Sequence, residues 1–406
     1  MSDLPATLPV VVIGGGQAGL ATSSELTRRG VEHTVLERGR IGSSWRGRWD
    51  SFCLVTPNWS LNLPGFAYAG DDPDGYLPRD GIVGYLEDFA RSFGAPVHEE
   101  VDVTSVRPSD DGLVLTTSAG TVTAGRVVVA SGTYRRPHRP SAAAALPPGL
   151  LRLDADGYRN PGDLPEGRIL VVGSGQTGCQ LSEELHRAGR DVVLSCGRAP
   201  WMPRRFGGHD VVWWGSRNGF LDMTLESLPS PMARLSANVL ATGRDGGHDL
   251  HLRTLREMGV TLAGHLVGAD DRAVRFEADL GDSVAWGDAR FAEFRALSGR
   301  LAAELGIDTG LEDPEPFDAR GAPQEVDLAG IAAVVFTGGF RPDYASWIAV
   351  DGAFDELGFP RQLDGISLAD RRLAFVGVHF QRVRKSSLFW GVGEDAAIVA
   401  EAITTT

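Results

Sequence analysis

The hydrophobic and polar positions along the chain repeat one arrangement twice. Residues 9–13 (PVVVI) form a short apolar run, followed by a glycine stretch, a helix-like run to residue 29 and a second apolar run at 33–37. The same order returns at 168–172, 173–178, 180–187 and 190–195. A short continuous apolar run is typical of a buried parallel strand, so each block predicts a strand–helix–strand unit.

The rest of the pattern predicts how these two units are connected. Further buried strands are expected at 126–130, 332–336 and 373–378, a small antiparallel piece over 101–123, and helices at 82–93, near 249–258 and from Glu394. Residues 41–80 read as a long loop, which in a compact domain is usually functional. We therefore predict an α/β fold of two nested Rossmann-like dinucleotide-binding domains. The expected boundaries are 1–165 plus 325–406 for the first domain and 166–324 for the second, with an inserted helical subdomain near 200–250.

Composition narrows the classes of function. A chain of 406 residues suits two domains, and its net charge of -14 disfavours nucleic acid as a partner. No run approaches the roughly 20 apolar residues of a membrane helix, and the N-terminus has no basic region before its apolar stretch. Three cysteines form no Cys-x-x-Cys pair, and the histidines show no metal-binding spacing. We expect a cytoplasmic protein without a metal site or membrane partner, and a homodimer stays open.

Two glycine motifs carry the functional hypothesis. Gly14-Gly15-Gly16-Gln17-Ala18-Gly19 and Gly173-Ser174-Gly175-Gln176-Thr177-Gly178 both fit G-x-G-x-x-G. In a chain with 52 glycines the bare pattern is weak, but each copy follows a strand and opens a helix. The first glycine permits the tight turn, the second lets a pyrophosphate approach, and the third lets the helix pack on the strand. The phosphates then meet free N–H groups at the helix N-terminus.

The ends of the second strands distinguish the two sites. Glu37 lies 23 residues after Gly14, where an acid accepts hydrogen bonds from a ribose and disfavours a 2′-phosphate. Cys196 holds the corresponding place after Gly173, and Arg198, Arg204 and Arg205 follow it. Because guanidinium groups bind phosphate, the first site suits the adenosine of FAD and the second suits NADPH. The alternative is that these arginines are solvated surface charge.

At this point the sequence resembles the flavin-containing monooxygenases, including bacterial and YUCCA-type members. The likeness is carried in order by VVIGGGQAGLA, LERGRIGSSWRGRWDSFCLVTPNWSLNLPGF, VVVASGTYRRP, YRNPGDLPEGRILVVGSGQTGCQLSEEL, VVFTGGFRPD and GVGEDAAIVAEAI. It implies that NADPH reduces bound FAD and that a C4a-(hydro)peroxyflavin transfers one oxygen atom of O2 to a small organic substrate. The family segment F-x-G-x-x-x-H-S is not kept, because Asp154 and Ala155 stand where His-Ser falls.

The resemblance also implies residue roles. Trp45 and Asn58 are the candidate catalytic residues, on the flavin side of the first site. The candidate cofactor-binding residues are Gly14, Gly16, Gln17, Gly19, Glu37, Arg38, Trp45, Arg46, Val103, Ser131, Gly132 and Asp395 in the first site, and Gly173, Ser174, Gly175, Gln176, Thr177, Gly178, Arg198 and Arg204 in the second. Asn58 is alternatively a residue that caps a turn.

Three functions compete on this reading. The first is an FAD- and NADPH-dependent monooxygenase that acts on a nitrogen, sulfur or carbonyl group. The second is an NADPH-dependent flavin reductase, electron-transfer enzyme or NADPH oxidase, for which the missing Cys-x-x-Cys excludes only the dithiol version. The third is a flavin-binding module without activity. Oxygen incorporation that depends on substrate separates the first function from the others.

Overall fold

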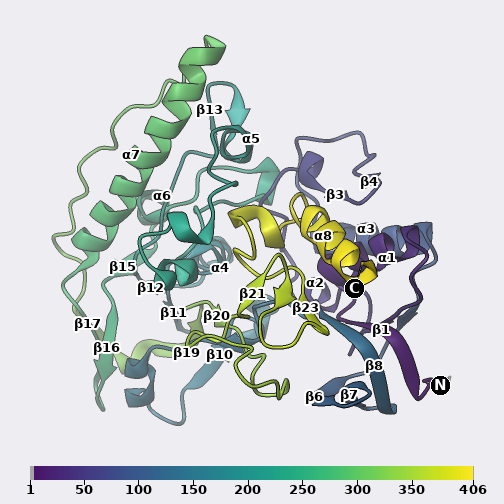
Figure 1. Cartoon of the computed structure of the whole chain (residues 1–406). Coiled ribbons are helices and arrows are strands. Elements are labelled where there is room, and N and C mark those ends of the chain that lie inside the picture. The colour runs from purple at the N-terminus through teal and green to yellow at the C-terminus, as the bar shows by residue number, and fades with distance from the viewer. Residues whose placement is uncertain (1–3, 406) are drawn as a thin grey trace.

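The computed structural model describes residues 4–405 and contains two large sheets, each with a glycine turn at the carboxyl end of a central strand (Figure 1). This confirms the predicted α/β fold with two Rossmann-like units. The first sheet has the order β21-β22-β23-β8-β1-β2-β5, and β6 and β7 extend it from β8. Its strands are β1 (Thr7–Ile13), β2 (Thr34–Leu36), β5 (Val97–His98), β6 (Val103–Ser109), β7 (Gly112–Thr117), β8 (Gly120–Val129), β21 (Gln362–Leu363), β22 (Ile366–Ser367) and β23 (Leu373–Phe375).

The second sheet is parallel throughout and has the order β10-β19-β11-β12-β15. Its strands are β10 (Leu151–Asp154), β11 (Arg168–Val172), β12 (Val192–Ser195), β15 (Thr261–Ala263) and β19 (Ile331–Phe336). Every residue of β12 and nearly every residue of β11 and β19 is buried, as the continuous apolar runs in the sequence predict.

The sheet pairing corrects the predicted domain boundaries. Residues 1–165 and 325–406 were expected to form the first domain, yet β10 and β19 both belong to the second sheet. β19 pairs with β10 on one side and with β11 on the other. A buried apolar run is compatible with either sheet, so its length and composition do not indicate which one it joins. The second unit therefore includes residues on both sides of the predicted 166–324 segment.

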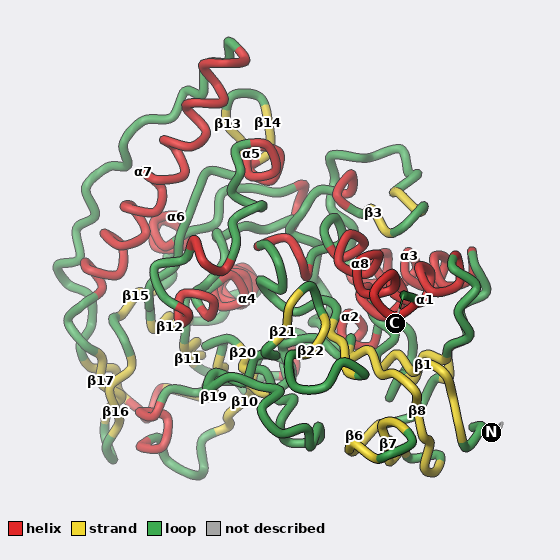
Figure 2. Tube along the Cα trace, viewed as in Figure 1, coloured by secondary structure: helices red, strands yellow, loops and turns green. Residues whose placement is uncertain are grey.

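The helices also depart from the sequence reading in one region. Residues 200–250 hold one short helix among irregular chain and 3-10 turns, so the expected helical subdomain is wrong (Figure 2). The long helix α7 (Leu280–Leu305) was not predicted, and its buried face packs against the aromatic residues of this segment. The other helices are α1 (Gln17–Arg28), α2 (Ser43–Arg46), α3 (Arg79–Ser92), α4 (Gln176–Arg187), α5 (Val211–Arg217), α6 (Leu252–Met258) and α8 (Val392–Thr404).

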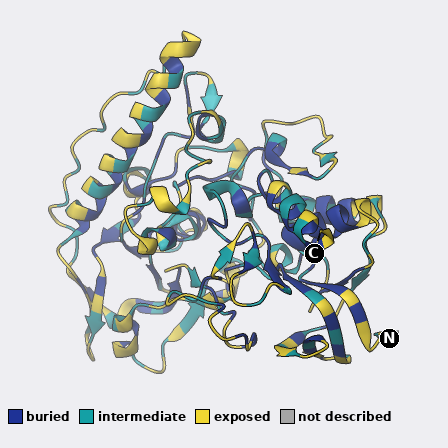
Figure 3. Ribbon diagram, in the orientation of Figure 1, coloured by how far each residue is buried: buried dark blue, intermediate teal, exposed yellow. Residues whose placement is uncertain are grey.

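The two units share one hydrophobic core, although their sheets are separate (Figure 3). Its buried residues include Val12 and Leu20 from the first unit, and Ile169 and Leu181 from the second. The chain passes between the units through β9 (Arg136–Pro137) and β20 (Phe340–Arg341), which pair as a short antiparallel ribbon. The other small sheets are β3 (Asn62–Leu63) with β4 (Phe66–Ala67), β13 (Arg205–Phe206) with β14 (His209–Asp210), and β16 (Leu266–Ala269) with β17 (Ala273–Phe276) and β18 (Glu325–Asp327).

Over residues 4–405, every helix falls short of the combined length and hydropathy that a membrane crossing requires.

Candidate functional site

The first glycine turn joins β1 to α1, and each of its glycines does a different job. Gly14 has a φ of 115°, and a Cβ there would lie 2.7 Å from the Ala130 carbonyl oxygen. A Cβ on Gly19 would lie 1.8 Å from the Gly14 carbonyl oxygen, so only glycine lets α1 pack this closely. A Cβ on Gly16 would meet nothing within 4 Å. The N-terminus of α1, which no side chain caps, therefore faces open space beside Gly16.

The second glycine turn, between β11 and α4, has the same construction. Gly173 has a φ of 110°, and a Cβ on Gly178 would lie 1.8 Å from the Gly173 carbonyl oxygen. The Thr337 hydroxyl donates to that same oxygen at 2.6 Å. A Cβ on Gly175 would meet only Ala237 Cβ, at 3.6 Å. Both turns thus leave room for a phosphate at the second glycine and fill the space at the first and third.

Glu37 is buried directly after β2 and is held by the first turn. Its carboxylate accepts hydrogen bonds from the backbone N–H of Gly15 at 2.6 Å and of Gly39 at 2.9 Å. These bonds fix a negative charge beside the turn, where it favours a ribose hydroxyl and disfavours a 2′-phosphate. The neighbouring Arg38 is exposed, and Val103, at the start of β6, is buried in the core beneath this strand end.

The chain around the first turn provides the rest of a cofactor cradle. Ser131 follows β8 beside Gly14, and its buried hydroxyl lacks a hydrogen-bond partner within residues 4–405. Gly132, with a φ of 77°, lets the chain turn away after it. Asp395 is buried in the first turn of α8 and pairs with Arg382 at 2.9 Å, while burial raises the pKa of its carboxyl. A polar atom left without a partner next to an open turn fits a bound dinucleotide.

Trp45 links the first turn to the C-terminal part of the chain. Its indole N–H donates to Gln17 Oε1 at 3.1 Å, and its ring stacks on Phe389 with ring centres 5.5 Å apart. Gln17 Nε2 in turn donates to the Ser387 carbonyl at 3.4 Å. Arg46 points the other way, toward α3, where it pairs with Glu87. The predicted flavin side is therefore a contiguous set around Gln17 and Trp45, with Arg46 on its outer edge.

The second site presents an unpaired arginine. Arg198 is exposed two residues after Cys196, and within residues 4–405 its side chain has no ion pair or hydrogen bond. Ser174 anchors the turn beneath it, because its hydroxyl exchanges two hydrogen bonds of 2.9 Å with the Gly197 backbone. Gln176 donates to the Val239 carbonyl at 3.3 Å, and Thr177 follows it, partly buried. A free guanidinium at this strand end suits a 2′-phosphate.

Comparisons with known proteins agree with this geometry. The model of the pyridine nucleotide-disulphide oxidoreductase family matches residues 11–207. A CzcO-like oxidoreductase of Geobacillus kaustophilus is 30% identical over 95% of both chains. Indole-3-pyruvate monooxygenase YUCCA4 of Oryza sativa is 31% identical over 47% of this chain and 48% of its own length. A flavin monooxygenase mutant from Stenotrophomonas maltophilia has a TM-score of 0.71 at 17% identity over 99% of both chains.

The chain belongs to a family of CzcO-like oxidoreductases. Its relatives of matching length are CzcO-like oxidoreductases, and the resemblance inferred from the motifs is confirmed. Flavin-containing monooxygenases, which the motifs resemble, use FAD and NADPH, and the two glycine turns give this chain two candidate dinucleotide sites.

Asn58 and Arg204, both predicted site residues, have internal structural roles, of which only that of Asn58 was among the alternatives in the sequence analysis. The Asn58 amide donates to the Asp72 carbonyl at 2.9 Å and accepts from the Leu77 N–H at 2.7 Å, so it holds the long loop. Its catalytic role stays a prediction. Arg204 is 2% exposed and pairs with Asp210 at 2.8 Å. It also donates to the Tyr76 hydroxyl at 3.0 Å and to the Val55 carbonyl at 2.8 Å, so it joins the two units and is too deeply buried for the predicted nucleotide contact.

The residue that departs from the family segment, Asp154, forms an ion pair in the structure. Asp154, where the family has histidine, ends β10 and makes a two-point pair with Arg139 at 2.7 and 2.8 Å. The three cysteines are free thiols, and burial raises the pKa of both Cys179 and Cys196. Buried neutral thiols are poor nucleophiles, so this member lacks the environment that a dithiol centre requires at these two positions.

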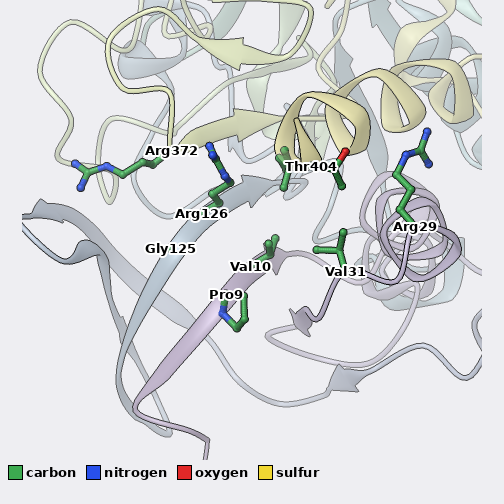
Figure 4. A pocket seen from close by; sticks show the side chains of 9 residues that line it. Pro9, Val10, Arg29, Val31, Gly125, Arg126, Arg372 and Thr404 are labelled. Carbon is green, nitrogen blue, oxygen red and sulfur yellow. The ribbon is translucent and has the colours of Figure 1, made fainter. Parts of the chain in front are cut away.

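A surface depression is lined by residues of β1, β8, the end of α1 and α8, and none of its lining residues belongs to either glycine turn (Figure 4). It has a volume of about 650 Å³ and is lined by Pro9 in the first half of β1 and Gly125 in the middle of β8, together with three arginines. Each of these arginines already has a partner, Glu25 for Arg29, the Arg371 carbonyl for Arg126 and Asp370 for Arg372. Strand ends far from the glycine turns are not where this fold binds dinucleotides.

Proposed function

We propose that the protein is an FAD-dependent monooxygenase that takes electrons from NADPH and transfers one atom of O2 to a small organic substrate. The observation that carries this proposal is the pair of glycine turns with equivalent construction, one beside buried Glu37 and the other beside unpaired Arg198. The first unit then holds FAD and the second holds NADPH. A cytoplasmic location and a homodimer stay predictions.

The chain's own residues bind and orient the cofactors and exclude water. Glu37 would accept hydrogen bonds from the ribose hydroxyls of FAD. The free N–H groups at the start of α1 would bind the pyrophosphate of FAD, and those of α4 the pyrophosphate of NADPH. Trp45 and Phe389, stacked beside Gln17, would close the flavin side against solvent. FAD, when bound, supplies the oxygen-activating chemistry, and a site closed to water favours oxygen transfer over peroxide release.

The test begins with the purified protein. Mass spectrometry of the released chromophore should give FAD, and NADPH should bleach the bound flavin faster than NADH does. Under ¹⁸O2, a panel of an amine, a sulfide, a cyclic ketone and a 2-oxo acid is then screened for labelled product and for hydrogen peroxide. One labelled oxygen in a product supports the proposal. Stoichiometric peroxide with every compound at every pH tried would replace it with the oxidase function.

A further inference from the structure

Arg384 is a partly buried cation with no anion to neutralise it. It begins the 3-10 turn η8 (Arg384–Ser387), and its guanidinium carbon lies 4.3 Å from the centre of the Phe220 ring and 4.9 Å from that of Phe380. Within residues 4–405 its side chain makes no hydrogen bond or ion pair, and its Nε is fully buried without a partner. Burial lowers the pKa of this guanidinium to about 10. A charge held this way is costly unless something pairs with it.

Two other arginines that join the two units, Arg234 and Arg204, have partners within the protein. Arg234 lies 3.6 Å over the Phe359 ring and donates twice to the His379 carbonyl, at 2.8 and 2.6 Å. Arg204 pairs with a buried aspartate. Both use their nitrogens on acceptors inside the protein, as an arginine that only fastens two segments does. Arg384 packs on two aromatic rings, yet within residues 4–405 its side-chain nitrogens have no acceptor and are left for a group from outside.

The acids on the segments around η8 pair with other cations and not with Arg384. The neighbouring acids are already paired, Asp395 with Arg382 at 2.9 Å, and Asp222 and Glu394 with Lys385 at 3.1 and 2.9 Å. His379 packs against Phe380 with ring centres 4.8 Å apart. Burial, together with the charges of Arg384 and Arg234, lowers the pKa of His379 to about 4, so it is neutral at pH 7.

Arg384 stands where the two units meet, next to the flavin side of the site. Three residues after Arg384, the Ser387 carbonyl accepts a hydrogen bond from the side chain of Gln17. Gln17 is part of the first glycine motif and accepts a hydrogen bond from the Trp45 indole. The Arg384 backbone N–H donates to the Met223 carbonyl at 2.9 Å, which brings a segment of the second unit against η8. An anion on Arg384 would therefore lie between the units and close to the residues that line the predicted flavin site.

We propose that Arg384 binds the carboxylate of the substrate, so the enzyme acts on small organic acids. This inference rests on the proposed monooxygenase function. A guanidinium makes two parallel hydrogen bonds to a carboxylate, and the Phe220 and Phe380 rings would hold its plane in place for both. The bound anion would also offset the cost of the buried charge.

The experiment titrates the FAD-loaded enzyme with benzoate, phenylacetate and 3-phenylpropionate, and follows the flavin absorbance spectrum. The matching amides serve as neutral probes. Arg384→Gln should weaken binding of the carboxylates by about 10- to 100-fold, because a charged hydrogen-bonding partner is lost. The carboxylate affinity of Arg384→Lys should fall between those of the wild type and of Arg384→Gln. Arg107→Gln removes an exposed arginine of β6 whose side chain has no ion pair or hydrogen bond within residues 4–405, and this variant should bind the acids as the wild type does.

Two further measurements keep the outcome clear. If Arg384→Gln loses FAD, wild-type enzyme is treated with phenylglyoxal, and benzoate but not benzamide should protect Arg384 in the peptide map. The proposal is overturned if the wild type responds to none of the three acids, or if Arg384→Gln binds them unchanged. It is also overturned if the variant loses affinity for NADPH and not for the acids, since a nucleotide phosphate is then the anion. Carboxylate binding in an enzyme that releases only peroxide would contradict the monooxygenase function alone.

Discussion

Alanine at Gly16 and alanine at Gly19 should fail in different ways, although each adds one methyl group to the same turn. At Gly16 the methyl group meets no protein atom within 4 Å, and the backbone angles of -89° and -172° suit any residue. At Gly19 it lies 1.8 Å from the Gly14 carbonyl oxygen. Gly16→Ala should therefore fold and lose FAD, whereas Gly19→Ala should lose stability.

The magnitudes follow from these distances. Ordinary van der Waals contact begins near 3.4 Å, so α1 would have to move by about 1.6 Å to accept alanine at Gly19. Overpacking of this kind costs about 1–3 kcal/mol of unfolding free energy, or more. Gly16→Ala should instead change the stability of the FAD-free protein by less than about 1 kcal/mol, in the favourable direction. Its methyl group blocks the phosphate from the N–H groups of α1, and one such charged hydrogen bond is worth about 1.5–3 kcal/mol, or roughly 10- to 100-fold in FAD affinity.

Urea unfolding of the FAD-free variants gives the stabilities, and quenching of flavin fluorescence gives FAD affinity. The second turn provides a matched pair of variants, because a Cβ on Gly175 has space whereas a Cβ on Gly178 would clash with the Gly173 carbonyl oxygen. Gly175→Ala should keep FAD and stability but weaken NADPH. Wild-type FAD affinity in a folded Gly16→Ala protein would refute the reasoning, since the open glycine would then not be where the pyrophosphate approaches.

Three further predictions concern charge. Arg198→Ala should raise the Michaelis constant for NADPH by about 10- to 100-fold with little change for NADH, and equal use of both by the wild type would contradict the assignment. Arg204→Ala should destabilise the fold by about 3–5 kcal/mol in urea, because the largely buried carboxylate of Asp210 loses the cation that balances its charge, and should leave the affinity for NADPH unchanged. The more exposed Arg205→Ala is its control. Burial lowers the pKa of His251 from 6.5 to about 4. Keeping His251 neutral in the fold thus contributes about 3 kcal/mol to the free energy of unfolding above pH 6.5, and this stability is lost as the pH falls toward 4. The urea midpoint of His251→Asn should therefore depend less on pH than that of the wild type.

The glycine turns were predictable because their constraints are local. The strand before each turn, the positive φ of Gly14 and Gly173, and the close approach at the third glycine all act within six residues. Glu37 was found by its distance along the chain, since β1 and β2 are neighbours in the same sheet. These signals need no knowledge of how remote segments pack.

The features that sequence reasoning missed depend on remote partners. The place of β19 between β10 and β11 is decided by pairing across more than 150 residues, which an apolar run does not encode. Arg204 looked available for a phosphate because its partners, Val55, Tyr76 and Asp210, come from two units. Helix α7 was obscured by its interior glycines, Gly281, Gly287 and Gly299, which lower helix propensity although its buried face holds it in place.

The antiparallel ribbon of β9 and β20 brings together the two points at which the chain enters and leaves the second unit. The second unit is therefore inserted into the first at a single place. Arg136 pairs with Arg341 and Pro137 with Phe340, so the chain leaves the first sheet and returns to it between hydrogen-bonded neighbours. Antiparallel partners are about 5 Å apart, a gap that a two-residue turn closes. The whole second unit could thus have entered an ancestral form of the first unit through a single hairpin loop, without altering the order of the first unit's strands. By the same route it can be exchanged for the second unit of a relative, which would change the proposed NADPH site while the proposed FAD site of the first unit is kept.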